Sequence, residues 1–229
     1  ESQNTIPEYI DEIIYYLGQS YAFIWQNVNQ DILFNGNYLS NNHEFDQYLK
    51  RLGYKFKNEN KEVGGYAILK NKKIILVMDI GDSPNKKFSN DYQSGALSFE
   101  IISSGKKLIS NSGYFPNKQN KLHKISKSTA LQSVLIIDDY SSCNFKEIEK
   151  SNFVIEKGLK ITKKNIVSED NYWKISAAHD GYLQKFGSIH EREVEFYPEQ
   201  IKFVGFDRII RKNITKKIKF DIRFHLDPS

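Results

Sequence analysis

The first fifty residues carry apolar positions at helical spacing. Pro7 suits the first turn of a helix, and an apolar stripe follows it. The stripe consists of Ile10, Ile13, Ile14, Leu17, Tyr21 and Ile24. This pattern predicts a helix over about residues 6–28. A second helix is predicted from His43 to Leu52, because Gly53 suits a helix end.

From about Lys61 the pattern changes to short apolar runs separated by turn residues. Two pairs of these runs flank short turns, at Asn71-Lys72 and at residues 103–106, as antiparallel hairpins do. The predicted strands are Gly64–Lys70, Lys73–Ile80, Ala96–Ile102, Lys107–Asn111, Ser133–Ile137, Phe153–Ile161, Tyr172–Ala177, Ile189–Phe196, Ile201–Phe206 and Lys217–Leu226. Many short strands without intervening helices predict a mainly β protein, an antiparallel β-sandwich with an N-terminal helical segment.

The run Lys217–Leu226 shows the most regular alternation of apolar and polar residues. Ile218, Phe220, Ile222, Phe224 and Leu226 share one face, so we expect one half-buried antiparallel strand. This strand ends close to the end of the chain, and the sheet is therefore expected to be truncated at its C-terminal side. The predicted organisation is a helical segment over residues 1–55 and a β-sandwich domain over residues 56–229.

The charge is basic but is composed mainly of lysine. The chain carries a net charge of +5, with 28 Lys and 5 Arg among its 33 basic residues. A basic surface attracts polyanions, including acidic polysaccharides. Arginine is the residue suited to bidentate phosphate contacts, and no nucleic-acid-binding motif is evident, so we predict no nucleic-acid partner. The aromatic content of 14% suits a packed core or a sugar-binding face.

Several classes of protein are disfavoured by what the sequence lacks. Cys143 is the only cysteine, so neither an internal disulfide nor a cysteine-based zinc site is expected. No apolar run reaches the length of a membrane span, and the polar start at Glu1–Asn4 does not resemble a signal peptide.

Five blocks, in order, resemble the heparinase II/III family. They are Gly64–Tyr66 with Ile75–Gly81; Gly95–Glu100 with Leu108–Gly113; Ser128–Val134 with Asp138 and Asp139; Ala178–Tyr182 with Phe186-Gly187 and His190–Arg192; and Arg223–Leu226. Leu33–Gly36 also resembles the junction that precedes the sandwich in that family.

This resemblance implies a helical toroid followed by a β-sandwich. It also implies a polysaccharide lyase activity. Relatives cleave uronic-acid-containing polysaccharides, such as glycosaminoglycans, by β-elimination, with a tyrosine or histidine as the usual proton carrier. The chain would then be the C-terminal domain of a bacterial polysaccharide lyase of the periplasm or cell envelope. Its partners would be an acidic polysaccharide and the toroid, of which only the last helix is expected here. Without most of the toroid, its status as an enzyme stays open, and a non-catalytic carbohydrate-binding or scaffolding module is the alternative.

The family resemblance also locates three metal-ligand positions. Relatives hold a metal with His, Asp and His, and these positions fall at Gln93, Asn111 and Gln132. Zinc prefers imidazole, thiolate and carboxylate ligands over neutral amides. We therefore predict no metal and no cofactor, with the amides hydrogen-bonding one another and so holding the same loops together.

His179 and Tyr182 are the predicted catalytic residues. Both lie in the block Ala178–Tyr182, where Gly181 indicates a turn that should expose the flanking side chains. A histidine bonded to backbone inside the sandwich, and a packed tyrosine, are the alternatives.

His190 and Arg192 are the predicted substrate-binding residues. Residues two apart on a strand share a face, and Arg192 can bind a uronate carboxylate bidentately. Because Glu191, Glu193 and Glu195 occupy the other face, an ordinary surface ion-pair ladder is the alternative.

Overall fold

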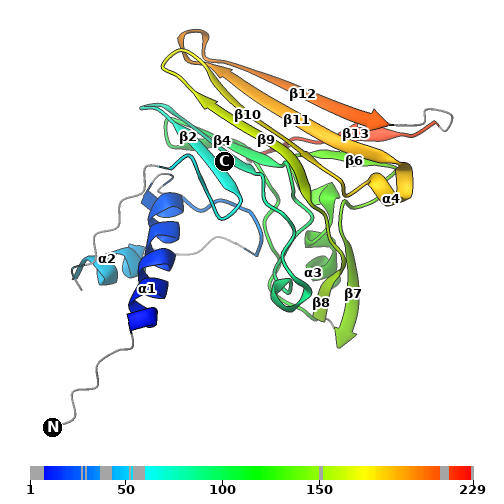
Figure 1. Cartoon of the computed structure of the whole chain (residues 1–229), viewed down its shortest axis with the longest axis horizontal. Coiled ribbons are helices and arrows are strands. Elements are labelled where there is room, and N and C mark those ends of the chain that lie inside the picture. The colour runs from blue at the N-terminus through cyan, green and yellow to red at the C-terminus, as the bar shows by residue number, and fades with distance from the viewer. Residues whose placement is uncertain are drawn as a thin grey trace.

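The computed structural model describes residues 8–26, 28, 30–36, 43–51, 53, 60–149, 152–211 and 217–227 (Figure 1). The helical segment contains α1 (Glu8–Tyr21), which continues into the π-helix η1 (Ala22–Gln26), and α2 (His43–Arg51). Short helices lie between the strands: η2 (Lys86–Phe88), α3 (Lys121–Ser126), η3 (Thr129–Leu131), α4 (Leu183–Phe186) and η4 (Pro198–Gln200).

Two antiparallel sheets form a β-sandwich, as predicted. The six-stranded sheet has the order β1 (Glu62–Val63), β2 (Tyr66–Lys70), β3 (Ile74–Asp79), β4 (Phe99–Ser103), β5 (Lys106–Ser110) and β14 (His225–Leu226). The four-stranded sheet has the order β12 (Lys202–Arg211), β11 (Ser188–Tyr197), β10 (Trp173–His179) and β9 (Ile161–Ser168). Two smaller pairs are β13 (Phe220–Ile222) with β6 (Leu135–Ile137), and β7 (Asn144–Glu149) with β8 (Asn152–Lys157).

The main core lies between the two sheets. Alternate residues of β3, such as Leu76 and Met78, meet alternate residues of β10 and β11, such as Ile175 and Phe196, and all four side chains are buried. Successive side chains of a strand point to opposite faces of the sheet, which places these residues on a single face.

The opposite face of the six-stranded sheet is covered by the helical segment. Phe23, Ile32 and Phe34 pack with Val77 and other apolar residues of that face. A buried carboxylate also joins the two parts, because Glu100 accepts hydrogen bonds from the Leu33 backbone N–H at 3.0 Å and from the Lys107 ammonium at 2.9 Å. The helical segment therefore covers sheet surface that would otherwise face solvent.

Most predicted strands are present with shifted ends, but two predictions are wrong. The predicted strand Phe153–Ile161 is divided, because residues 158–160 lie outside any strand and β8 and β9 pair with different neighbours. Strand β7 was not predicted at all. The predicted strand Lys217–Leu226 is likewise divided between β13 and β14, which pair with different neighbours.

The apolar face of that last run is not a core face. Phe220 is 51% exposed and Leu226 is 73% exposed. The chain leaves β13 at Arg223, whose backbone N–H donates to Val134 O and whose guanidinium donates to Ala130 O. These bonds anchor the break between the two short strands. The predicted division at residues 55 and 56, and the predicted C-terminal truncation, stay predictions.

Candidate functional site

Three of the four predicted site residues meet inside the sandwich. His179 lies at the end of β10, directly opposite His190 of β11, and Arg192 lies opposite Asp207 of β12. His190 Nδ1 lies 3.3 Å from His179 Nε2, and His190 Nε2 lies 2.6 Å from Asp207 Oδ1. The Arg192 guanidinium donates to both Asp207 oxygens, at 2.9 and 2.8 Å. We call these four residues the buried relay.

The hydrogen bonds of the buried relay determine which histidine nitrogens carry protons. The Gly181 backbone N–H donates to His179 Nδ1 at 3.1 Å, so His179 carries its proton on Nε2 and donates to His190 Nδ1. His190 then carries its proton on Nε2 and donates to Asp207. Both rings are neutral in this arrangement, and one negative carboxylate faces one positive guanidinium.

The electrostatics agree with that assignment. Burial lowers the pKa of His179 well below its ordinary value, and the neighbouring His190 and Arg192 lower it further. Burial also lowers the pKa of His190 and outweighs the opposing effect of Asp207. Burial raises the pKa of Asp207, but the hydrogen bonds from His190 and Arg192 outweigh it and bring the pKa to about 2.

The buried relay also joins the two sheets. Arg192 Nη1 donates to the carbonyl oxygens of Ser133 at 2.7 Å and Leu97 at 3.2 Å, both outside the four-stranded sheet. A single guanidinium therefore links β11, β12 and the loops that flank the six-stranded sheet.

The expectation that Gly181 leaves its neighbours exposed is wrong. His179 is 1% exposed and Tyr182 is fully buried, with its hydroxyl donating to Leu135 O at 3.2 Å. The turn folds inward because Gly181 packs against the Ser142 carbonyl, where a Cβ would approach to 2.6 Å. The catalytic roles of His179 and Tyr182 stay predictions, and their burial favours an indirect role.

His190 and Arg192 share a face, as predicted, but it is the inner face. Asp207 occupies the bidentate position that was expected to hold a uronate, and the substrate-binding roles of both residues stay predictions. The ion-pair ladder lies on the outer face, where Glu191 and Glu193 pair with Arg208 at 3.0 and 3.7 Å. Sequence reasoning missed Asp207, which only the register of β11 against β12 brings beside Arg192.

The amide of Gln93 links three loops. Its Nε2 donates to Gly113 O at 2.9 Å and to Ser126 O at 2.6 Å, and its Oε1 accepts from the Gly36 backbone N–H at 3.3 Å. The Gln93 backbone N–H donates to Asn35 Oδ1 at 3.1 Å. This side chain therefore holds the helical junction, the loop after β5 and the end of α3 together.

The other two amides are also buried within the structure. Asn111 Oδ1 accepts from the Ser133 backbone N–H at 2.8 Å, whereas Asn111 Nδ2 and Gln132 Nε2 have no hydrogen-bond partner among the described residues. Amide N–H groups cannot ligate zinc, and the described residues hold no group of three His, Cys, Asp or Glu placed for a metal. These three positions do not fit the zinc site of the family type. Gln93 and Asn111 hold the loops through backbone groups rather than through one another.

A hollow of about 240 Å³ lies where the helical junction meets the sandwich. Its lining includes Asn35, Tyr66 and Asp79, and Asn35 Nδ2 donates to Tyr66 Oη at 2.7 Å and to Asp79 Oδ2 at 3.1 Å. Burial raises the pKa of Asp79 to about 6, against the opposing hydrogen bonds from Gly81 and Asn35. Asp79 therefore carries a carboxyl that exchanges its proton near neutral pH. Asp79 also caps the turn that follows β3, since Oδ1 accepts from the Gly81 backbone N–H at 3.1 Å.

A second carboxylate, Asp91, lies exposed at the same hollow. Tyr114 Oη donates to Asp91 Oδ1 at 2.8 Å. Lys127 lies buried beneath, with its ammonium donating to the carbonyl oxygens of Asn90 and Tyr92 on either side of Asp91. Burial lowers the pKa of Lys127 to about 8, even though Asp91 opposes that effect. Neither Asp91 nor Lys127 stood out in the sequence, because their contacts join distant segments.

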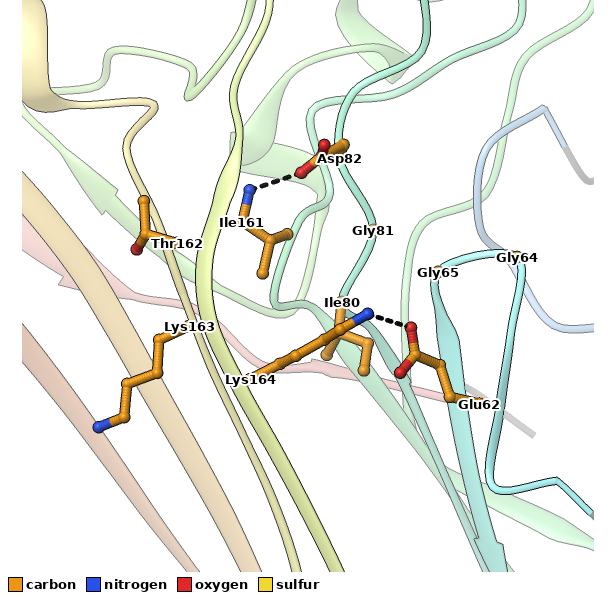
Figure 2. Close-up of a pocket in the computed structure, with 10 residues that line it drawn as sticks. All are labelled: Glu62, Gly64, Gly65, Ile80, Gly81, Asp82, Ile161, Thr162, Lys163 and Lys164. Carbon is orange, nitrogen blue, oxygen red and sulfur yellow. Dashed lines mark hydrogen bonds and ion pairs between the residues drawn. The ribbon is translucent and has the colours of Figure 1, made fainter.

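A larger groove of about 550 Å³ lies beside this hollow, at the open edges of the two sheets (Figure 2). Figure 2 shows Lys164 reaching from β9 across the groove to Glu62 of β1, whereas Lys163 points away from it. Gly65 and Gly81 approach closely in its wall, and a Cβ on Gly65 would lie 2.6 Å from Gly81 Cα. Asp82 Oδ1 accepts from the Ile161 backbone N–H at 2.7 Å and so connects the two edges.

A comparison with known families identifies the domain that carries these hollows. The family model described as heparinase II/III-like, C-terminal, matches residues 59–229. The chain belongs to this heparinase II/III-like family. No curated protein matches the chain.

Solved structures agree on the fold. A heparinase III gene product superposes with a TM-score of 0.66 at 15% identity, over 98% of this chain and 36% of that one. Heparan sulfate lyase HepC from Pedobacter heparinus superposes with a TM-score of 0.63 at 15% identity, over 91% of this chain and 34% of that one. The heparinase-like chain thus spans about a third of the length of these structures. Its described helices include none long and apolar enough to cross a membrane.

Proposed function

We propose that this heparinase-like domain forms the sandwich wall of the cleft in a lyase that cleaves uronic-acid-containing polysaccharides by β-elimination. The observation that carries the proposal is the hollow at the helical junction, where Asn35 joins Tyr66 and Asp79 beside the exposed Asp91. A helical domain like that of the longer relatives would complete the cleft. We place the protein in the periplasm or cell envelope, as the family resemblance implies.

The chemistry of β-elimination needs a proton acceptor beside the uronate and a proton donor at the departing oxygen. A carboxyl with a pKa of about 6 is suited to proton exchange at neutral pH, and it is Asp79 that has this value. Tyr66 offers a hydroxyl at the surface of the hollow, held by Asn35 at 2.7 Å. We assign proton transfer to this pair, with Asp91 in substrate contact.

The buried relay then has a supporting role in the proposal. Arg192 holds β11 and β12 to the loops that flank the six-stranded sheet, and Tyr182 bonds to Leu135 of β6. Their replacement is expected to act through folding, and not through the chemical step.

The test is a lyase assay on this chain and on the full-length protein, with heparan sulfate, chondroitin sulfate, hyaluronan and alginate as substrates. Product formation is followed by the ultraviolet absorbance of the new carbon–carbon double bond. We expect Asp79→Asn and Tyr66→Phe to lower kcat by about 100-fold or more. Tyr172→Phe is the control, because Tyr172 bonds Glu195 on the outer sheet face. Unchanged rates in both hollow variants would falsify this assignment.

A non-catalytic carbohydrate-binding domain is the second candidate. It is favoured by the amides at the three metal-ligand positions and by the burial of His179 and Tyr182. A full-length protein that binds a polysaccharide tightly, and yet forms no unsaturated product, would establish the binding function.

A further inference from the structure

Three hollows adjoin one another along the connection between β3 and η2. The groove of about 550 Å³ and the hollow of about 240 Å³ share Gly64, Gly81 and Asp82 in their linings. The hollow in turn shares Pro84 with a third depression of about 380 Å³, which is lined by residues 83–85 and 158–160 among others. We call this feature the 81–85 trough. Its extent over several adjoining hollows suits a chain-like ligand better than a single small molecule.

One part of the trough floor is held in place by hydrogen bonds from the connection between β8 and β9. Ser83 Oγ donates to Leu159 O at 3.0 Å and accepts from the Leu159 backbone N–H at 2.8 Å. Gly158 permits this contact, since a Cβ there would lie 2.1 Å from Ser83 Oγ. A floor fixed before binding lowers the ordering cost of binding a ligand.

The trough carries an unusually exposed aromatic ring. Phe88 lines the middle hollow and is 73% exposed, although large aromatic side chains are generally buried in folded proteins. The Lys87 ammonium lies 5.7 Å from the centre of the Phe88 ring. An exposed flat ring with a cation over it is suited to a sugar ring that carries an acidic group.

Hydrogen-bonding groups surround that ring. The carboxylates of Asp82 and Asp91 are exposed at the same hollow and can accept hydrogen bonds from sugar hydroxyls. Burial raises the pKa of Asp82, but the Ile161 N–H and the Lys160 ammonium outweigh it and keep that pKa below its ordinary value. Asp82 therefore remains an ionised acceptor throughout the neutral range.

We infer that the 81–85 trough binds an acidic oligosaccharide, with one sugar ring stacked on Phe88 and an acidic group paired with Lys87. The choice of an acidic sugar rests on the proposed function, whereas stacking on Phe88 rests on the exposed ring itself. Phe88 is thus a substrate-positioning residue outside the proton-transfer pair.

The test is calorimetric titration of the chain with a heparan sulfate hexasaccharide and with neutral cellohexaose. Phe88→Ala is expected to weaken heparan sulfate binding about tenfold, and Phe88→Leu nearly as much, since leucine is apolar but lacks the flat face. Lys87→Gln is expected to weaken heparan sulfate binding about fivefold at low salt without affecting cellohexaose. Phe206→Ala is the control, because Phe206 is 41% exposed on the outer face of β12.

The outcomes distinguish a failure of the trough proposal from a failure of the lyase proposal. Binding that depends on Phe88, in a protein without lyase activity, supports the trough and contradicts the lyase assignment. Lyase activity and binding that are both unchanged in Phe88→Ala overturn the trough and leave the lyase assignment intact. The trough proposal is also wrong if neither sugar binds the wild-type chain, or if Phe206→Ala weakens binding as much as Phe88→Ala. Thermal midpoints equal to wild type exclude unfolding as the cause.

Discussion

Replacement of Asp207 by asparagine tests whether the buried relay holds the two sheets together. Asp207 is the anion opposite Arg192, and their side chains are 8% and 2% exposed. An asparagine keeps the shape of the side chain but replaces one acceptor oxygen by an NH₂ group. That group is a donor, and it would face the N–H donors of His190 and Arg192. The Arg192 charge would then lie buried without a counter-charge, which typically costs about 3–5 kcal/mol.

The acid–base properties of Asp207 give a second measure of the same interaction. Its pKa of about 2 in the folded protein lies below an ordinary value of 3.8. This difference corresponds to about 2.5 kcal/mol that stabilises the fold when the carboxylate is ionised. Because the folded pKa is the lower one, this stability is present above about pH 4 and is lost as the pH falls through 2. The two values, about 2.5 and about 3–5 kcal/mol, bracket a cost of about 3 kcal/mol at neutral pH.

The assay is urea and thermal unfolding followed by circular dichroism at pH 7. For a chain of this size, a loss of about 3 kcal/mol lowers Tm by about 6–12 °C. Glu193→Gln is the matched control on the same strand, since its ion pairs at 3.7 and 3.8 Å lie on the outer face and contribute at most about 1 kcal/mol. Adding Arg192→Met to Asp207→Asn should recover part of the loss by removing the uncompensated charge. The reasoning is refuted if Asp207→Asn lies within about 1 kcal/mol of wild type, or if the two substitutions are simply additive.

Four further predictions concern the fold and its dependence on pH. Gly65→Ala should lower the free energy of unfolding by about 2–3 kcal/mol, because Gly65 has a φ of +87° and lies against Gly81. Gly64→Ala, with no atom within 4 Å of its added Cβ, should cost about 1 kcal/mol, and equal costs would contradict the close approach. Asp79 has a folded pKa raised to about 6, so its contribution to the stability of the fold is greatest below pH 4 and is lost as the pH rises through 6. In unfolding curves from pH 4 to 7, Asp79→Asn should therefore lose about 3 kcal/mol less stability than the wild type does. His179 has a lowered folded pKa, so stability should fall as the pH drops below about 6.5, and His179→Gln should show a shallower fall in Tm between pH 7 and 5. Gln93→Ala should lower Tm, with a cost of about 1–3 kcal/mol from the unpaired backbone groups, whereas a chelator should leave the wild-type Tm unchanged; a large effect of chelation would show that a metal holds these loops.

The sandwich was predictable because short apolar runs follow one another between turn residues, without intervening helices. Alternation along β11, from Ser188 to Tyr197, places every second side chain inside, and the structure follows that pattern through the whole strand. The division of Lys217–Leu226 was not predictable in the same way, since Arg223 breaks the strand through bonds to residues about ninety positions away. Local alternation predicts which side chains share a face of a strand, but it does not predict which neighbouring strands will pair with that strand.

The candidate site was less predictable, because paired polar residues can also occupy the inward positions of a strand, as His190 and Arg192 do. His190 and Arg192 share a face in the sequence pattern, but nothing local indicates whether that face meets solvent or the other sheet. Their partner Asp207 lies on β12 and comes opposite Arg192 only through the register of two strands joined at η4. A cationic pair that appears ready for a ligand in the sequence is therefore already neutralised within the fold.

A further set of polar groups comes together where the helical segment meets the sandwich. Asn35 reaches Tyr66 and Asp79 only because its own carbonyl oxygen is held by the Gln93 backbone N–H. Gln93 in turn depends on the loop after β5 and on α3 for its remaining bonds. The hollow thus forms only when the helical segment, the six-stranded sheet and the α3 loop are assembled together. A neutral amide makes this link at a position where relatives are expected to use a metal ligand, so the geometry of the hollow should depend on packing and not on ion availability.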